Sequence, residues 1–285
     1  YAPRPGVRWN PVAALQAHDA QVAASGITTV LDALRIGLHD DEALKAEDFT
    51  RLGDAIRQAR AAGRLRADHY IHLRCEVAAP DCLTAFAPYE GDQLVRLASL
   101  MDHSPGQRQF ATVDAYRAYY QKKKKLTDSE FDDFAARRKR ESEEFSGPHR
   151  AALAERAREQ GIVLASHDDA TEEQVIEARE HGMRIAEVPT SLTAARASRD
   201  HGLAILMGAP NVVRGGSHLG WASAAPLAER GLVTVLASDY VWPAMLEAAF
   251  AMVKRGVLDL PRAWALVSAN PAEACGLADR GRLAP

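Results

Sequence analysis

Short apolar runs alternate with longer amphipathic stretches along most of the chain, and this rhythm constrains the fold more than any other feature. Seven runs have the length and composition of buried strands: 26–34, 69–77, 93–103, 162–167, 183–189, 203–210 and 233–240. The stretches between them have helical character, and the one at 41–63 ends at Gly63, a usual helix stop. Strands that alternate with helices form parallel sheets. The rhythm therefore predicts an α/β fold with a parallel sheet.

The length of the chain favours a TIM-like (β/α) barrel. Its 285 residues are close to the typical size of such barrels, ~250 residues. A closed barrel needs eight strands, so we expect one more strand before Tyr1. The chain begins without Met and ends just after a predicted helix, which suggests that both ends continue in a longer protein. Because no internal repeat or low-complexity linker interrupts the pattern, residues 1–285 are predicted to form one domain.

The region at 111–160 is densely charged and is predicted to be helical, with a break at Gly147-Pro148. Basic runs at 122–125 and 137–140 lie among acidic residues. Such runs usually form solvated helix faces. A contact in a homo-oligomer is the alternative.

The bulk composition excludes several classes of partner. The net charge of −3 gives no reason to expect nucleic acid or an anionic membrane surface. No apolar run approaches the ~18–20 residues that span a bilayer. The three cysteines form no CxxC pair, which favours a reducing cytoplasm over a disulfide framework.

Residues of the types that bind metal ions follow four of the predicted strands: Glu76, His103, His167 and Asp239. The C-terminal ends of parallel strands meet at one mouth of a barrel, so distant residues of this kind can form one site. Imidazole and carboxylate together suit a divalent Zn, Mn, Fe or Co ion, and such an ion can activate water at neutral pH. The spacing therefore predicts a metal-dependent hydrolase in which Glu76, His103, His167 and Asp239 bind the ion. If Asp239 is buried at the barrel mouth, it can also accept the proton from metal-bound water.

Each of these assignments has a structural alternative. Glu76 can form an ion pair with Arg74, two residues earlier on the same face of the strand. His103 can be an ordinary loop histidine that is hydrogen-bonded to backbone. Asp239 can cap the helix that begins near Pro243.

Three further acids lie close to the predicted site. Asp168 and Asp169 directly follow His167, and they can orient it, join it as ligands or cap the next helix. Glu187 also ends a strand, and it can face the site or pair with a basic residue of a neighbouring element.

The segment 208–220 is rich in glycine and contains Asn211, Arg214 and His218. Glycines allow backbone N–H groups to approach an anion, and arginine binds phosphate with two parallel hydrogen bonds. Arg108, in the loop after His103, can also reach an anionic substrate. These residues predict a phosphate-binding loop at the barrel mouth, with a flexible connection as the alternative reading of the segment.

Eight segments of the chain form a recognisable set: APRPGVRW, GITTVLDALRIG, HLRCEV, MDHSPGQRQF, ASHDDAT, AEVPTSLTAAR, MGAPNVVRGGSHLG and ASDYV. Together they resemble the family of α-D-ribose 1-methylphosphonate 5-triphosphate diphosphatases, which belongs to the amidohydrolase superfamily and serves the carbon–phosphorus lyase pathway of phosphonate use. The resemblance implies a divalent metal centre in a distorted barrel. It also implies a small phosphorylated sugar as substrate, whose 5-triphosphate is hydrolysed with release of pyrophosphate.

The resemblance carries over to particular residues. It implies that Glu76, His103 and His167 bind the metal, with Glu76 as a bridging carboxylate, and that Asp239 is the acid at the last strand. The residues implied to bind the triphosphate and the sugar are Arg108, Asn211, Arg214 and His218. In this family a strand with a His-x-Asp pair and a small β-sandwich also contribute, and we expect both outside this chain. The alternatives are a hydrolase of cyclic amides or N-acyl groups and a non-catalytic barrel scaffold.

Overall fold

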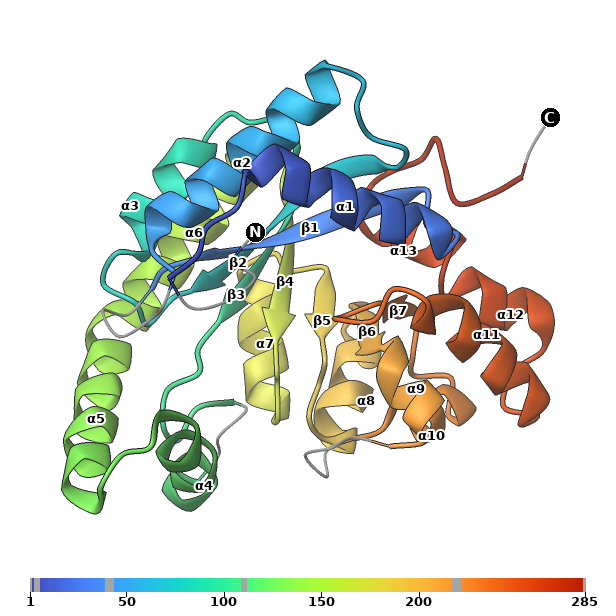
Figure 1. Cartoon of the computed structure of the whole chain (residues 1–285). Coiled ribbons are helices and arrows are strands. Elements are labelled where there is room, and N and C mark those ends of the chain that lie inside the picture. Colours follow the sequence, from blue (N-terminus) through green and yellow to red (C-terminus); the bar gives the residue numbers. More distant parts are fainter. Residues whose placement is uncertain (1, 3–5, 39–43, 109–111, 217–221, 284–285) are drawn as a thin grey trace.

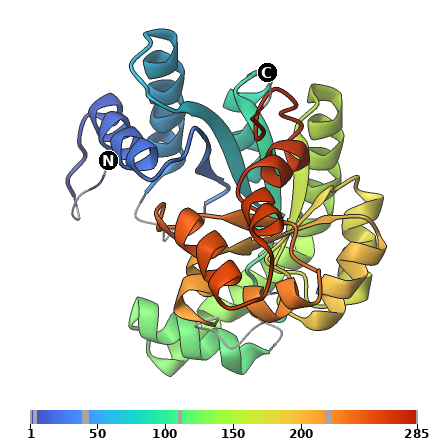
Figure 2. The same cartoon turned by 90° about the vertical axis from the view of Figure 1, so that its right-hand side faces the viewer.

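The computed structural model describes residues 2, 6–38, 44–108, 112–216 and 222–283. Within these residues, seven parallel strands follow one another across one sheet in chain order: β1 (Thr29–Ile36), β2 (Asp68–Glu76), β3 (Val95–Met101), β4 (Val163–His167), β5 (Ile185–Glu187), β6 (Ala204–Gly208) and β7 (Val235–Ala237). The sheet curls into a half-barrel (Figures 1 and 2). The seven predicted strands and their parallel arrangement are therefore confirmed. The closed barrel, the eighth strand and the β-sandwich stay predictions.

Helices connect the strands and cover the outer face of the sheet: α1 (Pro11–Ala24), α2 (Ala46–Ala61), α3 (Cys82–Phe86), α4 (Val113–Lys124), α5 (Asp128–Glu141), α6 (Gly147–Gln160), α7 (Glu172–Glu180), α8 (Leu192–Asp200), α9 (Ala209–Arg214), α10 (Ala224–Glu229), α11 (Ala244–Lys254), α12 (Leu260–Ala265) and α13 (Ala269–Ala274). Short helical turns lie at Ala87–Tyr89 (3₁₀) and Ser142–Ser146 (π). Helix starts follow the sequence: Thr171 and Gln174 form a capping box at α7, as the Thr-x-x-Gln spacing favours.

The two faces of β2 show how the sheet separates core from site. Leu73 and Cys75 are fully buried in a cluster with apolar residues of α2, α3 and α6. Successive side chains of a strand point to opposite faces, so Arg74 and Glu76 face the inside of the half-barrel. Glu76 ends the strand, and its carboxylate contacts His103 beyond the end of β3. The inner face thus carries polar side chains toward the C-terminal ends of the strands.

The predicted break at Gly147-Pro148 is wrong. Gly147 has helical dihedral angles (φ −64°, ψ −55°), and α5 passes through the π turn at Ser142–Ser146 directly into α6. A wider turn accommodates a proline that lacks an N–H donor. Ser142 and Ser146 both donate hydrogen bonds from their hydroxyls to Asp102 Oδ2, at 2.8 and 2.7 Å, which anchors the turn to the end of β3.

Three other segments differ from their prediction. The helix expected at 261–274 is divided into α12 and α13, because Ser268 adopts non-helical angles (φ −135°, ψ −85°). The glycine-rich segment after β6 begins as the helix α9 and only then reaches Gly215. Helices α4 and α5 form a pair that extends beyond the strand ends (Figure 1), held by an aromatic cluster around Tyr116. In the part of the chain that the structure describes, no helix has the length and apolar character needed to cross a membrane.

Candidate active site

Three side chains converge where β3 and β4 end. His103, His167 and Asp168 each offer a ligand atom, and these atoms lie within 4.8 Å of one another. Asp168 Oδ2 is 3.4 Å from His167 Nε2 and 3.8 Å from His103 Nε2. Asp168 adopts a positive φ of 57°, an uncommon conformation for a residue other than glycine. Such backbone strain is found where the surrounding structure fixes a side chain for function.

Two carboxylates hold the imidazoles in this arrangement. Glu76 accepts from the backbone N–H of His103 at 2.9 Å and lies 2.6 Å from His103 Nδ1. Glu187 lies 2.8 Å from His167 Nδ1. In both histidines the carboxylate contacts Nδ1 and leaves Nε2 facing Asp168. Carboxylates orient the histidine ligands of metal sites in this way.

The charges of these groups depend on one another. Burial alone would raise the pKa of the Glu76 carboxyl, but the charge and hydrogen bonds of His103 lower it below its usual value. Burial likewise opposes ionisation of Glu187, and His167 and Arg74 outweigh burial and hold its pKa well below the ordinary range. For His103, burial favours the neutral form, while Glu76 raises the pKa. Both glutamates are therefore ionised near neutral pH.

The residues present fit a divalent cation. Asp168 Oδ2 is buried and has no hydrogen-bond partner among the described residues. An unpaired buried carboxylate oxygen is costly unless a cation lies beside it. Arg74 of β2 places Nη2 3.4 Å from His167 Nε2, so an ion bound at Nε2 would take the place of this contact. Two imidazole nitrogens and one carboxylate oxygen form a donor set typical of Zn and related metals.

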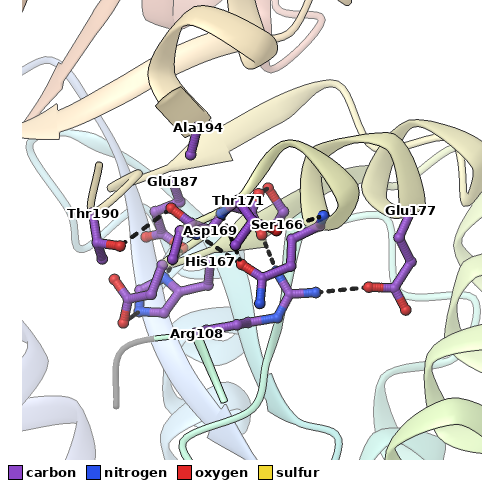
Figure 3. A network of polar contacts seen from close by, with 12 residues as sticks. Arg108, Ser166, His167, Asp169, Thr171, Glu177, Glu187, Thr190 and Ala194 are labelled. Atoms are coloured by element: carbon purple, nitrogen blue, oxygen red, sulfur yellow. Dashed lines mark hydrogen bonds and ion pairs between the residues drawn. The ribbon is translucent and has the colours of Figure 1, made fainter. Parts of the chain in front are cut away.

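Arg108 is more deeply buried than we expect for a residue that binds substrate at the mouth. It is 5% exposed and forms ion pairs with Asp169 and, at 3.1 Å, with Glu177 of α7. Figure 3 shows this network beside His167, and in it Ser166 also donates to Asp169. Burial lowers the pKa of Arg108 to about 10. In this structure Arg108 ties the loop after His103 to α7, and its contact with substrate stays a prediction.

The other predicted residues lie where β6 and β7 end. Arg214 donates to Asn211 Oδ1 at 2.7 Å and to the Tyr240 hydroxyl at 3.2 Å. The side chains of Asn211 and Asp239 both lie beside Gly208. A Cβ atom at Gly208 would be 3.7 Å from Asn211 Nδ2 and 3.9 Å from Asp239 Oδ2.

Asp239 itself is exposed and has a positive φ of 51°. The N-cap of α11 is Pro243, so Asp239 does not take the capping role. The predicted residue His218 lies outside the described residues.

Comparison with known proteins decides the family. No family model matches the chain. Over 283 residues, 99% of this chain and 75% of the relative, the sequence is 45% identical to the alpha-D-ribose 1-methylphosphonate 5-triphosphate diphosphatase of Escherichia coli (strain K12). The chain belongs to this diphosphatase family. The prediction made from the eight sequence segments is thereby confirmed.

Solved structures support the fold of this diphosphatase-family chain. An uncharacterized metal-dependent hydrolase from Pyrococcus furiosus superposes with a TM-score of 0.54 at 13% identity, covering 95% of this chain and 57% of that chain. N-isopropylammelide isopropylaminohydrolase from Burkholderia multivorans ATCC 17616 gives 0.53 at 14% identity, covering 95% of this chain and 66% of that chain. The chain thus spans less than two thirds of either structure. At these identities the likeness concerns the fold.

Two members of the site were not assigned from the sequence. The sequence leaves Asp168 open between ligand, orienting group and cap. In the structure Thr171 caps α7, which makes an aspartate cap unnecessary. The sequence does not decide the role of Glu187, because its partner His167 is twenty residues away. The acid directly after a strand-end histidine was the signal that could have identified Asp168.

Proposed function

We propose that this chain hydrolyses α-D-ribose 1-methylphosphonate 5-triphosphate to α-D-ribose 1-methylphosphonate 5-phosphate and pyrophosphate, with a divalent metal ion at His103, His167 and Asp168. The observation that carries the proposal is the 45% identity to the Escherichia coli diphosphatase over nearly the whole chain. Asp168 Oδ2 is buried between two imidazoles and has no hydrogen bond among the described residues, which supports the metal. The bond that breaks belongs to the anhydride between the first and second phosphates of the 5-triphosphate. The oxygen of a water molecule binds one of the two phosphorus atoms, and the bridging oxygen leaves with the other.

The residues at the ends of β2 to β5 have two roles, to hold the ion and to orient its ligands. A bound divalent ion supplies Lewis acidity and makes water more acidic. His103, His167 and Asp168 hold the ion, while Glu76 and Glu187 fix the direction of the two imidazoles. The sequence predicts that Glu76 binds the ion itself. This prediction remains part of the proposal, as the alternative to orienting His103.

The groups at the ends of β6 and β7 act on the substrate. Asp239 follows β7 and lies near Asn211, and in this proposal it accepts a proton from the attacking water. Arg214, with Asn211 beside it, binds phosphate oxygens and stabilises the charge that develops on the departing pyrophosphate. His218 belongs to the same predicted binding segment.

The test is to identify the products with and without metal. The purified chain is stripped with a chelator, reloaded with Zn²⁺, Mn²⁺, Fe²⁺ or Co²⁺ and incubated with the 5-triphosphate, and phosphorus NMR distinguishes pyrophosphate from orthophosphate. We expect pyrophosphate and the 5-phosphate in equal amounts, only after reloading. A cyclic amide such as hydantoin serves as control. Turnover of hydantoin by metal-loaded protein that leaves the triphosphate intact would establish the amidohydrolase alternative.

A further inference from the structure

A second group of histidines and carboxylates lies beneath α1, on the outer face of the sheet. His18 of α1 places Nε2 2.9 Å from Asp32 Oδ1, and His69 of β2 places Nδ1 2.6 Å from Asp32 Oδ2. The three residues each offer a ligand atom within 4.8 Å of the others. His69 is fully buried, and the side chains of Asp32 and His18 are 11% and 27% exposed. The group is therefore largely shielded from water, with His18 at its open side.

Asp19 fixes the orientation of His69. It is fully buried and lies 3.3 Å from His69 Nε2. It also accepts from the backbone N–H groups of Arg66 and Ala67, at 2.9 and 3.0 Å, and from the Arg66 guanidinium at 3.0 Å. Asp19 thus stays in place whatever occupies the other side of the ring. A carboxylate on one imidazole nitrogen, with the other nitrogen turned to the ion, is the usual arrangement around histidine ligands.

The group is separate from the proposed active site. His69 and Glu76 stand near opposite ends of β2, and the seven-residue separation places them about 23 Å apart along the strand. An odd separation also places them on opposite faces of the sheet. Glu76 contacts His103 on the inner face, whereas His69 contacts Asp19 of α1 on the outer face.

The charges of this group allow a cation to bind. Arg66 compensates Asp19, whereas both oxygens of Asp32 contact imidazoles. Burial opposes a charge on His69, but Asp32 and Asp19 outweigh burial and raise its pKa, so a proton on His69 offsets the Asp32 charge when no ion is bound. A divalent ion between the three donors would take the place of this proton.

We propose that His18, Asp32 and His69 bind a divalent transition-metal ion, with Zn²⁺ preferred, that fastens α1 to β1 and β2. Two imidazole nitrogens and a carboxylate oxygen match the ligand preferences of zinc. Ligands at ~2.0 Å from a tetrahedral ion are ~3.3 Å apart. The three ligand atoms lie within 4.8 Å of one another, so small side-chain shifts bring them to this spacing. The Trp242 ring lies 5.1 Å from the His18 ring and borders the group beside α1.

Zinc content in matched variants tests the site. Wild type, His18→Ala, His167→Ala and the double variant are stripped with a chelator, exposed to ZnCl₂, desalted and analysed for metal. We expect His18→Ala to hold one equivalent less than wild type, and the double variant one less than His167→Ala. His181→Ala, at the C-terminal end of α7, is the control and should keep the wild-type content. Equal zinc in wild type and His18→Ala would overturn the proposal and leave a hydrogen-bonded network without metal.

Two further measurements keep the test decisive if a variant loses its fold. Zinc at 100 times its Kd should raise the melting temperature of His167→Ala by ~5 °C, and this shift should vanish in the double variant. Crystals of the unmutated chain grown with ZnCl₂ should show anomalous scattering between His18, Asp32 and His69. The absence of that peak would contradict the site without reference to any variant.

Discussion

The C-terminal ends of β3 to β5 hold their polar side chains more firmly than the C-terminal ends of β6 and β7 do. On the side of β3 to β5, His167 and Asp168 are buried, and glutamates orient both imidazoles. On the side of β6 and β7, Arg214 and Asp239 are exposed. Electrostatic interactions are stronger away from water, so the buried side suits a metal ion that must keep its geometry. The exposed side suits a large, hydrated polyanion. The difference assigns metal binding to one side, and substrate recognition together with the proton transfer by Asp239 to the other.

The largest effect is expected from Asp168→Asn. The substitution keeps the size of the side chain and removes the charge of Asp168 Oδ2, which lies between His103 and His167 without a hydrogen bond among the described residues. We expect loss of the metal and a fall in kcat of ~100-fold or more. Elemental analysis and pyrophosphate release measure the two. Asp200→Asn, the same change at the exposed end of α8, is the control. If the variant keeps its metal and its kcat stays within ~2-fold of the wild-type value, Asp168 is not a ligand of the metal.

Glu187→Gln should have the next largest effect. The carboxylate holds His167 through Nδ1 at 2.8 Å, and the amide keeps the shape but loses the charge. Loss of such an orienting partner typically weakens metal binding ~10- to 100-fold. Zinc titration against a competing chelator gives the Kd. Glu180→Gln, at the end of α7, should leave it unchanged. Equal Kd values for wild type and Glu187→Gln would mean that burial alone orients His167.

The elements of the fold could be predicted because their signals are local. The strands carry β-branched and aliphatic runs, and the cap of α7 is contained in four consecutive residues. The prediction failed at Gly147-Pro148, where a local signal for a break competes with a distant interaction. Asp102, at the end of β3, accepts from Ser142 and Ser146 and stabilises the π turn. Nothing in the residues around position 147 indicates that contact.

The candidate site was predictable in part for the same reason. The strand ends identify His103 and His167, and the structure brings them together with a ring separation of 5.5 Å. The use of Glu76 and Glu187 to hold them depends on pairings between neighbouring strands. The burial of Arg108 depends on its ion pairs with Asp169, just after β4, and with Glu177 of α7. Both residues are more than sixty positions further along the chain. A strand-end pattern indicates which residues reach the mouth but not which of them turn away from it.

Arg214→Ala should separate recognition from chemistry. Arg214 is exposed at the end of α9, and we propose that it binds phosphate oxygens of the substrate. Its loss should raise KM ~10-fold, because a hydrogen bond to a charged group contributes ~1.5–3 kcal/mol, and should leave the metal content unchanged. The wild-type KM should rise with salt more steeply than that of the variant, since the interaction is screened. Arg262→Ala, on the exposed α12, is the control. A fall in kcat with unchanged KM would show that Arg214 acts only on the charge of the departing pyrophosphate and does not help to bind the substrate.

Tyr240→Phe should have the smallest effect and should act through Arg214. The Tyr240 hydroxyl accepts from Arg214 at 3.2 Å, and both side chains are exposed. Removing one such hydrogen bond costs ~1 kcal/mol at most on an exposed surface, which corresponds to a rise in KM of ~5-fold at most. If Tyr240 only positions the guanidinium, it should have no effect once Arg214 is alanine. Steady-state kinetics of the two single variants and the double variant measure this coupling. Additive effects would show that Tyr240 contacts the substrate itself, and the exposed side would then contain two independent binding groups.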